Sequence, residues 1–325
     1  MRLRLWLLLS LLFPGPAAAA LPRQTIAGHP YVDLATWATR QGYHVAWSLP
    51  DESMTLTHPA HRFRVKADSR QALIDGVLLR LSYPPVAVRG RLWIAERDVE
   101  TALVPVLQPL PVRADRRIRT IALNAGHGGK DPGNVEGRHQ EKAYALAWAQ
   151  EVRRRLEAAG FLVQMIRRQD TFVELDDRAA RANRVRADLY VSLHFNGVGR
   201  PGGGASGVET YCLTPAGASS SNDARQRGGA WHPSNRFDRE NLRLAWEVHR
   251  QLAAHSGLPD RGVRRARFRE LTLLDMPGIL VEGGFMDSPA DARVIYSAEG
   301  RARLARAVVD GILAFQRLTQ PAGRR

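Results

Sequence analysis

The sequence predicts an α/β fold, in which helices cover both faces of a mostly parallel, twisted sheet, preceded by a small α+β domain. From residue 118 onward, short apolar runs that favour strands alternate with longer segments whose apolar residues recur at helical spacing. Such alternation is typical of a parallel sheet with helices on both sides. Residues 21–112 carry several short strand-like stretches and few helical ones. A proline- and arginine-rich stretch, QPLPVRADRR at 108–117, separates the two patterns.

The first twenty residues have the pattern of an export signal. A basic start (MRLRLW) precedes an apolar run (WLLLSLLF) and small residues (PGPAAAA). The apolar run is shorter than the roughly 20 residues that a membrane span requires, which favours a cleaved signal over an N-terminal anchor. We therefore expect cleavage after Ala20 and an exported protein, in the periplasm or at the cell wall, without a membrane span. Its single cysteine, Cys212, excludes an internal disulfide.

Residues 21–112 are predicted to form the small α+β domain. A helical pattern at 31–42 precedes four short strand-like stretches: YHVAWS, SMTLTH, HRFRVK and VLLRLS. The segment PVAVRGRLWIA predicts a hairpin that turns at Arg89–Gly90, and DVETALVPVL predicts a closing helix. A linker at 113–117 then leads into the second domain, residues 118–320.

The second domain is predicted to begin with a strand at 118–126 and a helix at 141–160. The later elements follow in order: a strand at 161–168, a helix at 174–187, strands at 188–196 and 207–213, a helix at 235–257, a strand at 278–285, and one or two helices over 289–318. Two segments rich in Gly, Ser and Asn, 197–206 and 214–235, are predicted loops. They lie beside strand ends, where the sites of open α/β sheets are found.

The formal net charge is +15, to which Arg2 and Arg4 of the signal contribute two. A strongly basic protein favours acidic partners. For an exported chain we expect anionic wall polymers, peptide carboxylates or a membrane surface rather than nucleic acid.

Four residues at strand ends or helix starts predict a metal site. His127 lies in the glycine-rich stretch LNAGHGGKDPG, Glu141 begins the next helix, His194 closes a strand and Glu282 lies in an apolar strand. The glycine spacing does not match a phosphate-binding loop. Two imidazoles and a carboxylate on separate elements fit a catalytic zinc site. Each residue also has a structural alternative: a core histidine, a helix-start acid, or a glutamate paired with arginine.

Residues 118 to about 316 resemble the zinc-dependent N-acetylmuramoyl-L-alanine amidases of bacterial cell walls. The resemblance rests on six blocks in order: NAGHGGKDPG, QEKAYAL, DDRAARANRVRAD, VSLHFNG, GVETY and MPGILVEGGFMDSPAD. The chain departs from the family pattern at Asn124, where the family has aspartate. Residues 21–112 more weakly resemble the small α+β domain named after the N-terminus of copper amine oxidases, which implies wall binding or positioning and no copper chemistry.

The resemblance implies a zinc amidase fold and hydrolysis of the amide bond between N-acetylmuramic acid and L-alanine in peptidoglycan. It implies that His127, Glu141 and His194 bind Zn²⁺ and that Glu282 is the catalytic carboxylate. Asn124 is expected beside the ligands rather than among them. Because it lacks the charge of aspartate, we expect weaker zinc binding.

Five further residues are candidates for supporting roles. Arg178 and Asn183 are expected to brace their helix against the site loops. Arg264 and Arg267 either hold stem-peptide carboxylates or are solvated loop charges. Asn196 either orients a loop or contacts substrate.

Two other functions remain open at this stage: a catalytically inactive wall-binding protein, and a zinc peptidase that cuts within the stem peptide. Related amidases can carry a helix that blocks the zinc. Residues 214–235 are too rich in Gly and Ser for a stable helix, which predicts an open site, although an activator protein remains an alternative. The oligomeric state is left open.

Overall fold

The computed structural model describes residues 20–48, 52–108, 117–199, 204–221 and 228–319. The predicted signal, except Ala20, and the predicted linker, except Arg117, lie outside these ranges. In the part of the chain that is described, no helix is both long and apolar enough to cross a membrane.

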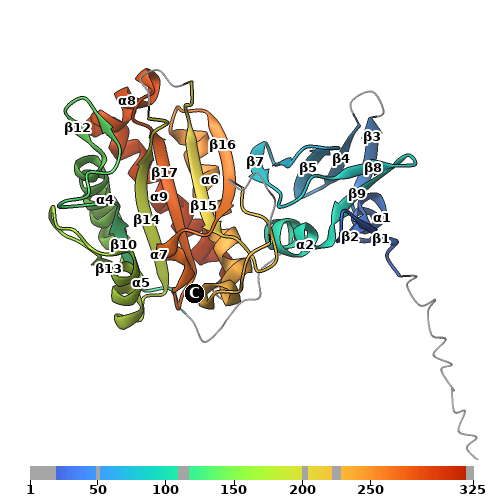
Figure 1. Cartoon of the computed structure of the whole chain (residues 1–325), viewed down its shortest axis with the longest axis horizontal. Coiled ribbons are helices and arrows are strands. Elements are labelled where there is room, and N and C mark those ends of the chain that lie inside the picture. Colours follow the sequence, from blue (N-terminus) through green and yellow to red (C-terminus); the bar gives the residue numbers. More distant parts are fainter. Residues whose placement is uncertain (1–19, 49–51, 109–116, 200–203, 222–227, 320–325) are drawn as a thin grey trace, which may run out of the picture.

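The second half of the chain forms a twisted sheet in the order β13-β10-β14-β17-β15-β16 (Figure 1). The strands are β10 (Thr120–Ala125), β13 (Leu162–Met165), β14 (Leu189–Asn196), β15 (Val208–Leu213), β16 (Asp260–Ala266) and β17 (Gly278–Phe285). All neighbours are parallel except β15 and β17, which run antiparallel. The predicted mostly parallel sheet is therefore confirmed, with one antiparallel pair inside it.

Helices cover both faces of this sheet, as the sequence predicts. The helices are α4 (Glu141–Ala158), α5 (Leu175–Arg184), α6 (Asp238–His255), α7 (Arg269–Thr272), α8 (Pro289–Tyr296) and α9 (Ala298–Thr319), with a 3-10 turn at Pro233–Phe237. A short hairpin of β11 (Val135–Glu136) and β12 (His139–Gln140) precedes α4.

The sheet's two faces differ in how they are covered. Odd positions of β10, β14 and β17, such as Leu123, Leu193 and Val281, pack into the large core with α4, α6 and α9. Even positions, such as Tyr190 and Leu280, belong to a smaller core with α5 and the segment around α7. Because side chains alternate along a strand, the predicted functional residues on these three strands lie on the face with the smaller core.

The first domain contains two sheets. Its strands are β1 (Arg23–Ile26), β2 (His29–Asp33), β3 (His44–Ser48), β4 (Ser53–His58), β5 (His61–Lys66), β6 (Gln71–Ile74), β7 (Val77–Arg80), β8 (Val86–Val88) and β9 (Arg91–Ala95). Its helices are α1 (Leu34–Arg40) and a closing helical stretch made of α2 (Glu96–Asp98), a π-helical turn (Val99–Leu103) and α3 (Val104–Leu107). The predicted hairpin at Arg89–Gly90 joins β8 and β9, and both turn residues have positive φ. Strands β1, β2 and β6 are not predicted from the sequence.

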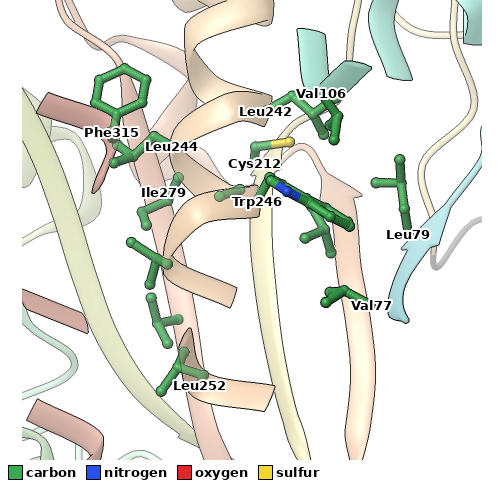
Figure 2. Packing of buried hydrophobic residues seen from close by; sticks show 14 of the residues in the cluster. Val77, Leu79, Val106, Cys212, Leu242, Leu244, Trp246, Leu252, Ile279 and Phe315 are labelled. Carbon is green, nitrogen blue, oxygen red and sulfur yellow. The ribbon is translucent and has the colours of Figure 1, made fainter. Parts of the chain in front are cut away.

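The two parts of the chain share one sheet and one core. Strand β7 pairs in parallel with β16 at Leu79 and Val263, which extends the sheet by the antiparallel strands β7-β6-β5-β4-β3. Val77, Leu79 and Val106 of the first part belong to the same buried cluster as Cys212 and Trp246 of the second (Figure 2).

Buried polar contacts join the same surfaces. Arg265 of β16 donates to Ser82 Oγ and to the carbonyl of Thr101, and lies 3.5 Å from Asp98 Oδ1. The backbone N–H of Leu78 donates to Asp260 Oδ2 at 2.9 Å. Strand β16 therefore contacts the first part of the chain through its backbone, its arginine and its aspartate.

Candidate metal centre

Glycines around His127 allow three side chains to meet at the end of β10. A Cβ on Gly133 would lie 2.6 Å from both Glu141 Oε2 and His127 Cδ2, and a Cβ on Gly126 would lie 2.3 Å from the His194 ring. Contacts below 3.0 Å are sterically excluded, so both positions require glycine. His127 itself has a positive φ of 58°. The glycine-rich stretch is therefore needed for the close approach of His127, Glu141 and His194.

Glu141 lies between the two imidazoles. Its Oε2 is 3.0 Å from His127 Nε2, and its Oε1 is 3.1 Å from His194 Nδ1. The carboxylate is fixed by backbone N–H donors from Asn134 and Phe195 at 2.9 and 3.0 Å. Its side chain is 1% exposed.

These three residues are the group of His, Cys, Asp and Glu side chains in the described ranges whose ligand atoms converge, all within 4.8 Å of one another. Burial by itself would raise the pKa of Glu141, but hydrogen bonds from His127 and His194 hold it well below its usual range. Burial would lower the pKa of His194, whereas its contacts with Glu141 and Glu270 raise it to about 10. The carboxylate thus stays ionised and attracts positive charge into the centre.

Each imidazole has a second carboxylate on its other nitrogen. His127 Nδ1 lies 2.8 Å from Asp131 Oδ2, and His194 Nε2 lies 3.4 Å from Glu270 Oε1. A carboxylate on the far nitrogen orients an imidazole that binds a metal through the near one. The arrangement leaves His127 Nε2 and His194 Nδ1 facing Glu141.

Glu282 faces His194 across the pair β14–β17. Its Oε2 is enclosed and has no hydrogen-bond partner among the described residues. Burial raises the pKa of Glu282 to about 8; the charge of His194 opposes this rise and nearby carboxylates add to it. A buried carboxylate with a raised pKa, beside a cavity, is suited to accepting a proton.

The centre opens into a cavity of about 480 Å³. Leu175, Phe268, Arg269 and Glu270 line it together with His127, Glu141, His194 and Glu282. The described residues of 214–235 contain no α-helix, only the 3-10 turn at Pro233–Phe237, and none of them lines this cavity.

Asn124 is fully buried beside the centre and does not face the converging ligand atoms. Its amide Nδ2 donates to Glu270 Oε2 and Ser192 Oγ at 2.9 Å, and its Oδ1 accepts from Arg178 Nη1 at 3.0 Å. Arg178 also donates to the carbonyl of His127 at 3.2 Å. Asn183 bonds Leu273 and Asp275, so helix α5 is tied to the loops on both sides of the cavity.

The other three candidates lie away from the cavity lining. Arg264 lies within strand β16, not in a loop, and donates to Glu209 Oε1 at 2.7 Å. Asn196 donates to the same carboxylate. Arg267 donates to the carbonyls of Pro215 and Ala218.

Asp131 and Glu270 are not among the site residues that the sequence predicts. Asp131 had a local signal, since an acid four residues after His127 in a glycine-rich turn can reach back to the ring. Glu270 has none, because it contacts His194 only through tertiary packing across 76 positions of chain.

Comparison with known proteins assigns most of the second part of the chain to one family. The family model for N-acetylmuramoyl-L-alanine amidase matches residues 121–314. The amidase AmiC of Neisseria meningitidis serogroup B is 33% identical over 268 residues, which is 75% of this chain and 61% of AmiC. LytC of Bacillus subtilis is 32% identical over 198 residues, covering 61% of this chain and 36% of LytC.

Solved structures agree with this grouping. The amidase AmiC2 of Nostoc punctiforme superposes with a TM-score of 0.51 and 31% identity, over 61% of this chain and 97% of that one. The chain spans less than two thirds of the length of AmiC and about a third of LytC.

Proposed function

This chain belongs to the N-acetylmuramoyl-L-alanine amidase family, and we propose that it hydrolyses the amide bond between N-acetylmuramic acid and L-alanine in peptidoglycan. One observation carries the proposal. Two imidazoles converge on one buried carboxylate, beside a glutamate with an enclosed, unpartnered oxygen, at the base of an open cavity.

The donor set fits Zn²⁺. His127 Nε2, His194 Nδ1 and a Glu141 oxygen supply two nitrogens and one oxygen, a set that catalytic zinc sites use with one position left open. No arginine or lysine is hydrogen-bonded to Glu141 among the described residues, so the carboxylate has no permanent cation of its own. When bound there, zinc would polarise the scissile carbonyl and lower the pKa of a water molecule toward 7.

Glu282 is proposed to move the proton. In its ionised form, a carboxylate whose pKa is raised by burial is a stronger base than an ordinary glutamate, and this form would take a proton from the attacking water. The same oxygen then protonates the leaving amine of L-alanine. Glu282 neighbours His194 across the pair β14–β17, which supports a role for its carboxylate beside the proposed metal ligands.

Among the described residues, Arg269 is the arginine that lines the cavity. Its side chain is 58% exposed and paired with exposed Asp176, and such pairs contribute little stability. We propose that Arg269, rather than Arg264 or Arg267, meets stem-peptide carboxylates. The latter two are bonded within the protein.

The proposal extends to the rest of the chain. The signal pattern at 1–20 and the cell-wall substrate class support an exported mature protein, and we propose that residues 21–112 bind or position the wall. Since the first part shares a sheet with the second, wall bound by the first part would lie at a fixed position relative to the cavity.

Mass spectrometry of digested peptidoglycan tests the function. The mature protein, residues 21–325 with zinc, should release stem peptides that begin with L-alanine, and chelator or Glu282→Ala should prevent their release. Peptides cleaved internally would support a zinc peptidase instead. Protein bound to an intact wall would support an inactive wall-binding protein, unless an added envelope extract restores cleavage and thereby reveals an activator.

A further inference from the structure

Glu270 is a buried carboxylate that the proposed reaction does not use. Its side chain is 5% exposed, it lies on the four-residue helix α7, and it belongs to the cavity lining. It has no ion pair with an arginine or lysine among the described residues. A buried charge of this kind is costly unless other groups satisfy it.

Three donors hold one oxygen of Glu270. Its Oε2 accepts from Tyr190 OH at 2.7 Å, Asn124 Nδ2 at 2.9 Å and Ser192 Oγ at 3.1 Å. These donors come from β10 and β14, the two strands that carry the histidines to the centre. Because three bonds fix Oε2, the carboxylate cannot rotate, and Oε1 is held 3.4 Å from His194 Nε2.

Glu270 is not one of the converging ligand atoms. The group within 4.8 Å comprises His127, Glu141 and His194. Glu141 contacts His194 at Nδ1, and Glu270 contacts it at the other nitrogen, Nε2. This is the position that Asp131 occupies relative to His127. Each histidine thus lies between Glu141 and a second carboxylate. The contact of His127 with Asp131 is a hydrogen bond, whereas His194 Nε2 makes a longer ion-pair contact with Glu270 and no hydrogen bond among the described residues.

Asn124 is matched to Glu270. Its Nδ2 must be a donor, since it faces Glu270 Oε2 at 2.9 Å, while its Oδ1 accepts from Arg178. An aspartate here would place a carboxylate oxygen against another carboxylate, which is destabilising in a buried site.

We propose that Glu270 is the positioning residue for His194, and that its charge takes the place of the aspartate that the amidase pattern carries at position 124. The proposal rests on the proposed function, because it assumes a metal at His127, Glu141 and His194. Glu270 holds the ring so that Nδ1 faces the metal. The weaker zinc binding expected from Asn124 alone therefore does not occur.

Zinc affinity of four variants tests this proposal. We would titrate the metal-free protein with Zn²⁺ against a fluorescent chelator, for the wild type, Glu270→Gln, Asn124→Asp and the double variant Asn124→Asp/Glu270→Gln. Glu270→Gln should bind Zn²⁺ about 10- to 100-fold more weakly. In the double variant, position 124 carries the carboxylate and position 270 carries the amide, so the pair is restored with its roles exchanged. This variant should recover most of the lost zinc affinity. Asn124→Asp alone should melt at a lower temperature and bind Zn²⁺ no more tightly than the wild type.

Glu209→Gln is the matched control. Glu209 is a buried carboxylate on the same sheet face, with arginine partners and no contact to either histidine. It should lower the melting temperature without changing zinc affinity. The visible absorption spectrum of the Co²⁺-loaded protein should change in Glu270→Gln and not in Glu209→Gln, since only the former changes the orientation of a ligand.

A folded Glu270→Gln with wild-type zinc affinity and an unchanged cobalt spectrum would overturn the proposal and leave the amidase function standing. Tighter zinc binding by Asn124→Asp alone would also overturn it. A wild type that binds no Zn²⁺ would overturn both this proposal and the metal in the proposed function. Should Glu270→Gln fail to fold, the double variant decides, because it lacks Glu270 yet is expected to bind Zn²⁺ almost as the wild type does.

Discussion

Two buried glutamates, Glu141 at the start of α4 and Glu209 in β15, differ in what surrounds them. Glu141 accepts from two imidazoles and backbone N–H groups. Glu209, which faces Glu282 across β15–β17, accepts from Arg261, Arg264 and Tyr211. Arginine keeps its charge and does not bind a metal, so the carboxylate of Glu209 is permanently neutralised and its cluster is not a metal site. Imidazoles can release their protons and offer lone pairs, so the cluster around Glu141 can bind a metal ion.

The comparison teaches how to distinguish a site from a structural ion pair. Burial of a carboxylate is common to both clusters and does not separate them. The two clusters differ in whether the partners of the carboxylate carry a permanent charge. Glu282 lies between the two clusters, and its Oε2 has no hydrogen-bond partner among the described residues. We therefore group Glu282 with the proposed metal site rather than with the ion pairs of Glu209.

The largest effect is expected from Glu141→Gln. The amide supplies one weak oxygen donor and no charge, so zinc affinity should fall by more than the roughly 100-fold that loss of a supporting residue causes. Amide hydrolysis should then be undetectable at micromolar Zn²⁺. Chelator titration and a peptidoglycan digest would measure the two losses. Zinc-dependent activity that persists in this variant would contradict the assignment of Glu141.

Glu282→Gln should separate chemistry from metal binding. The amide cannot accept a proton, so kcat should fall by about 100- to 10,000-fold. Zinc affinity should remain within the range of the wild type, because Glu282 is not among the converging ligand atoms. A variant that loses zinc and activity together would assign Glu282 to the ligands instead.

Arg264→Ala tests the cluster of ion pairs around Glu209. Removing one partner of a buried charge costs about 3 kcal/mol, and Arg261 still pairs with Glu209, which limits the loss. Urea unfolding should report that destabilisation, with zinc affinity unchanged. Arg303→Ala, which removes an exposed pair on α9, is the control and should have almost no effect. Zinc binding that falls in proportion to stability would mean that the clusters are not independent.

The smallest effect is expected at Asp260, a carboxylate with a single imidazole partner, His249, at 2.8 Å. Burial would raise the pKa of Asp260, but the hydrogen bond from His249 holds it below its usual 3.8. Since the folded pKa lies below the unfolded one, the stabilisation is complete above about pH 4 and is lost as the pH falls through the folded pKa. Asp260→Asn should cost about 1 kcal/mol at pH 7, with that cost shrinking toward pH 3.

Urea titrations of both proteins across this range would measure the difference. Asp260→Asn should leave zinc affinity unchanged, which shows that one imidazole beside a carboxylate does not make a metal site. A cost that grows on acidification would refute the assigned direction.

The sequence predicts the fold well, and it singles out the three residues whose ligand atoms converge, because both depend on local patterns. Alternating strands and helices predict the sheet, and the glycines around His127 indicate a close approach that the structure shows in detail. Strand β16 escapes prediction because its sequence, DRGVRRA, has no apolar alternation. Its arginines are tolerated in a strand only because Glu209, Ser82 and Thr101 meet them from distant parts of the chain.

Glu270 escapes prediction for a related reason. Its segment, RFREL, is typical of a charged loop, and its partners Asn124, Tyr190 and Ser192 lie at least 78 positions away. The shared sheet is equally hidden, since β7 and β16 pair at one position across 184 residues. Long-range pairings of this kind depend on the whole fold, and no local pattern in either segment specifies them.

The pairing of β7 with β16 also limits how the protein can be shortened. A fragment starting at residue 118 would leave β16 as an unprotected edge strand, with free backbone donors and acceptors along one side. It would also expose Trp246, which is 3% exposed in the whole chain, together with Val263 and Cys212. We therefore expect such a fragment to self-associate through that edge more readily than the whole chain does.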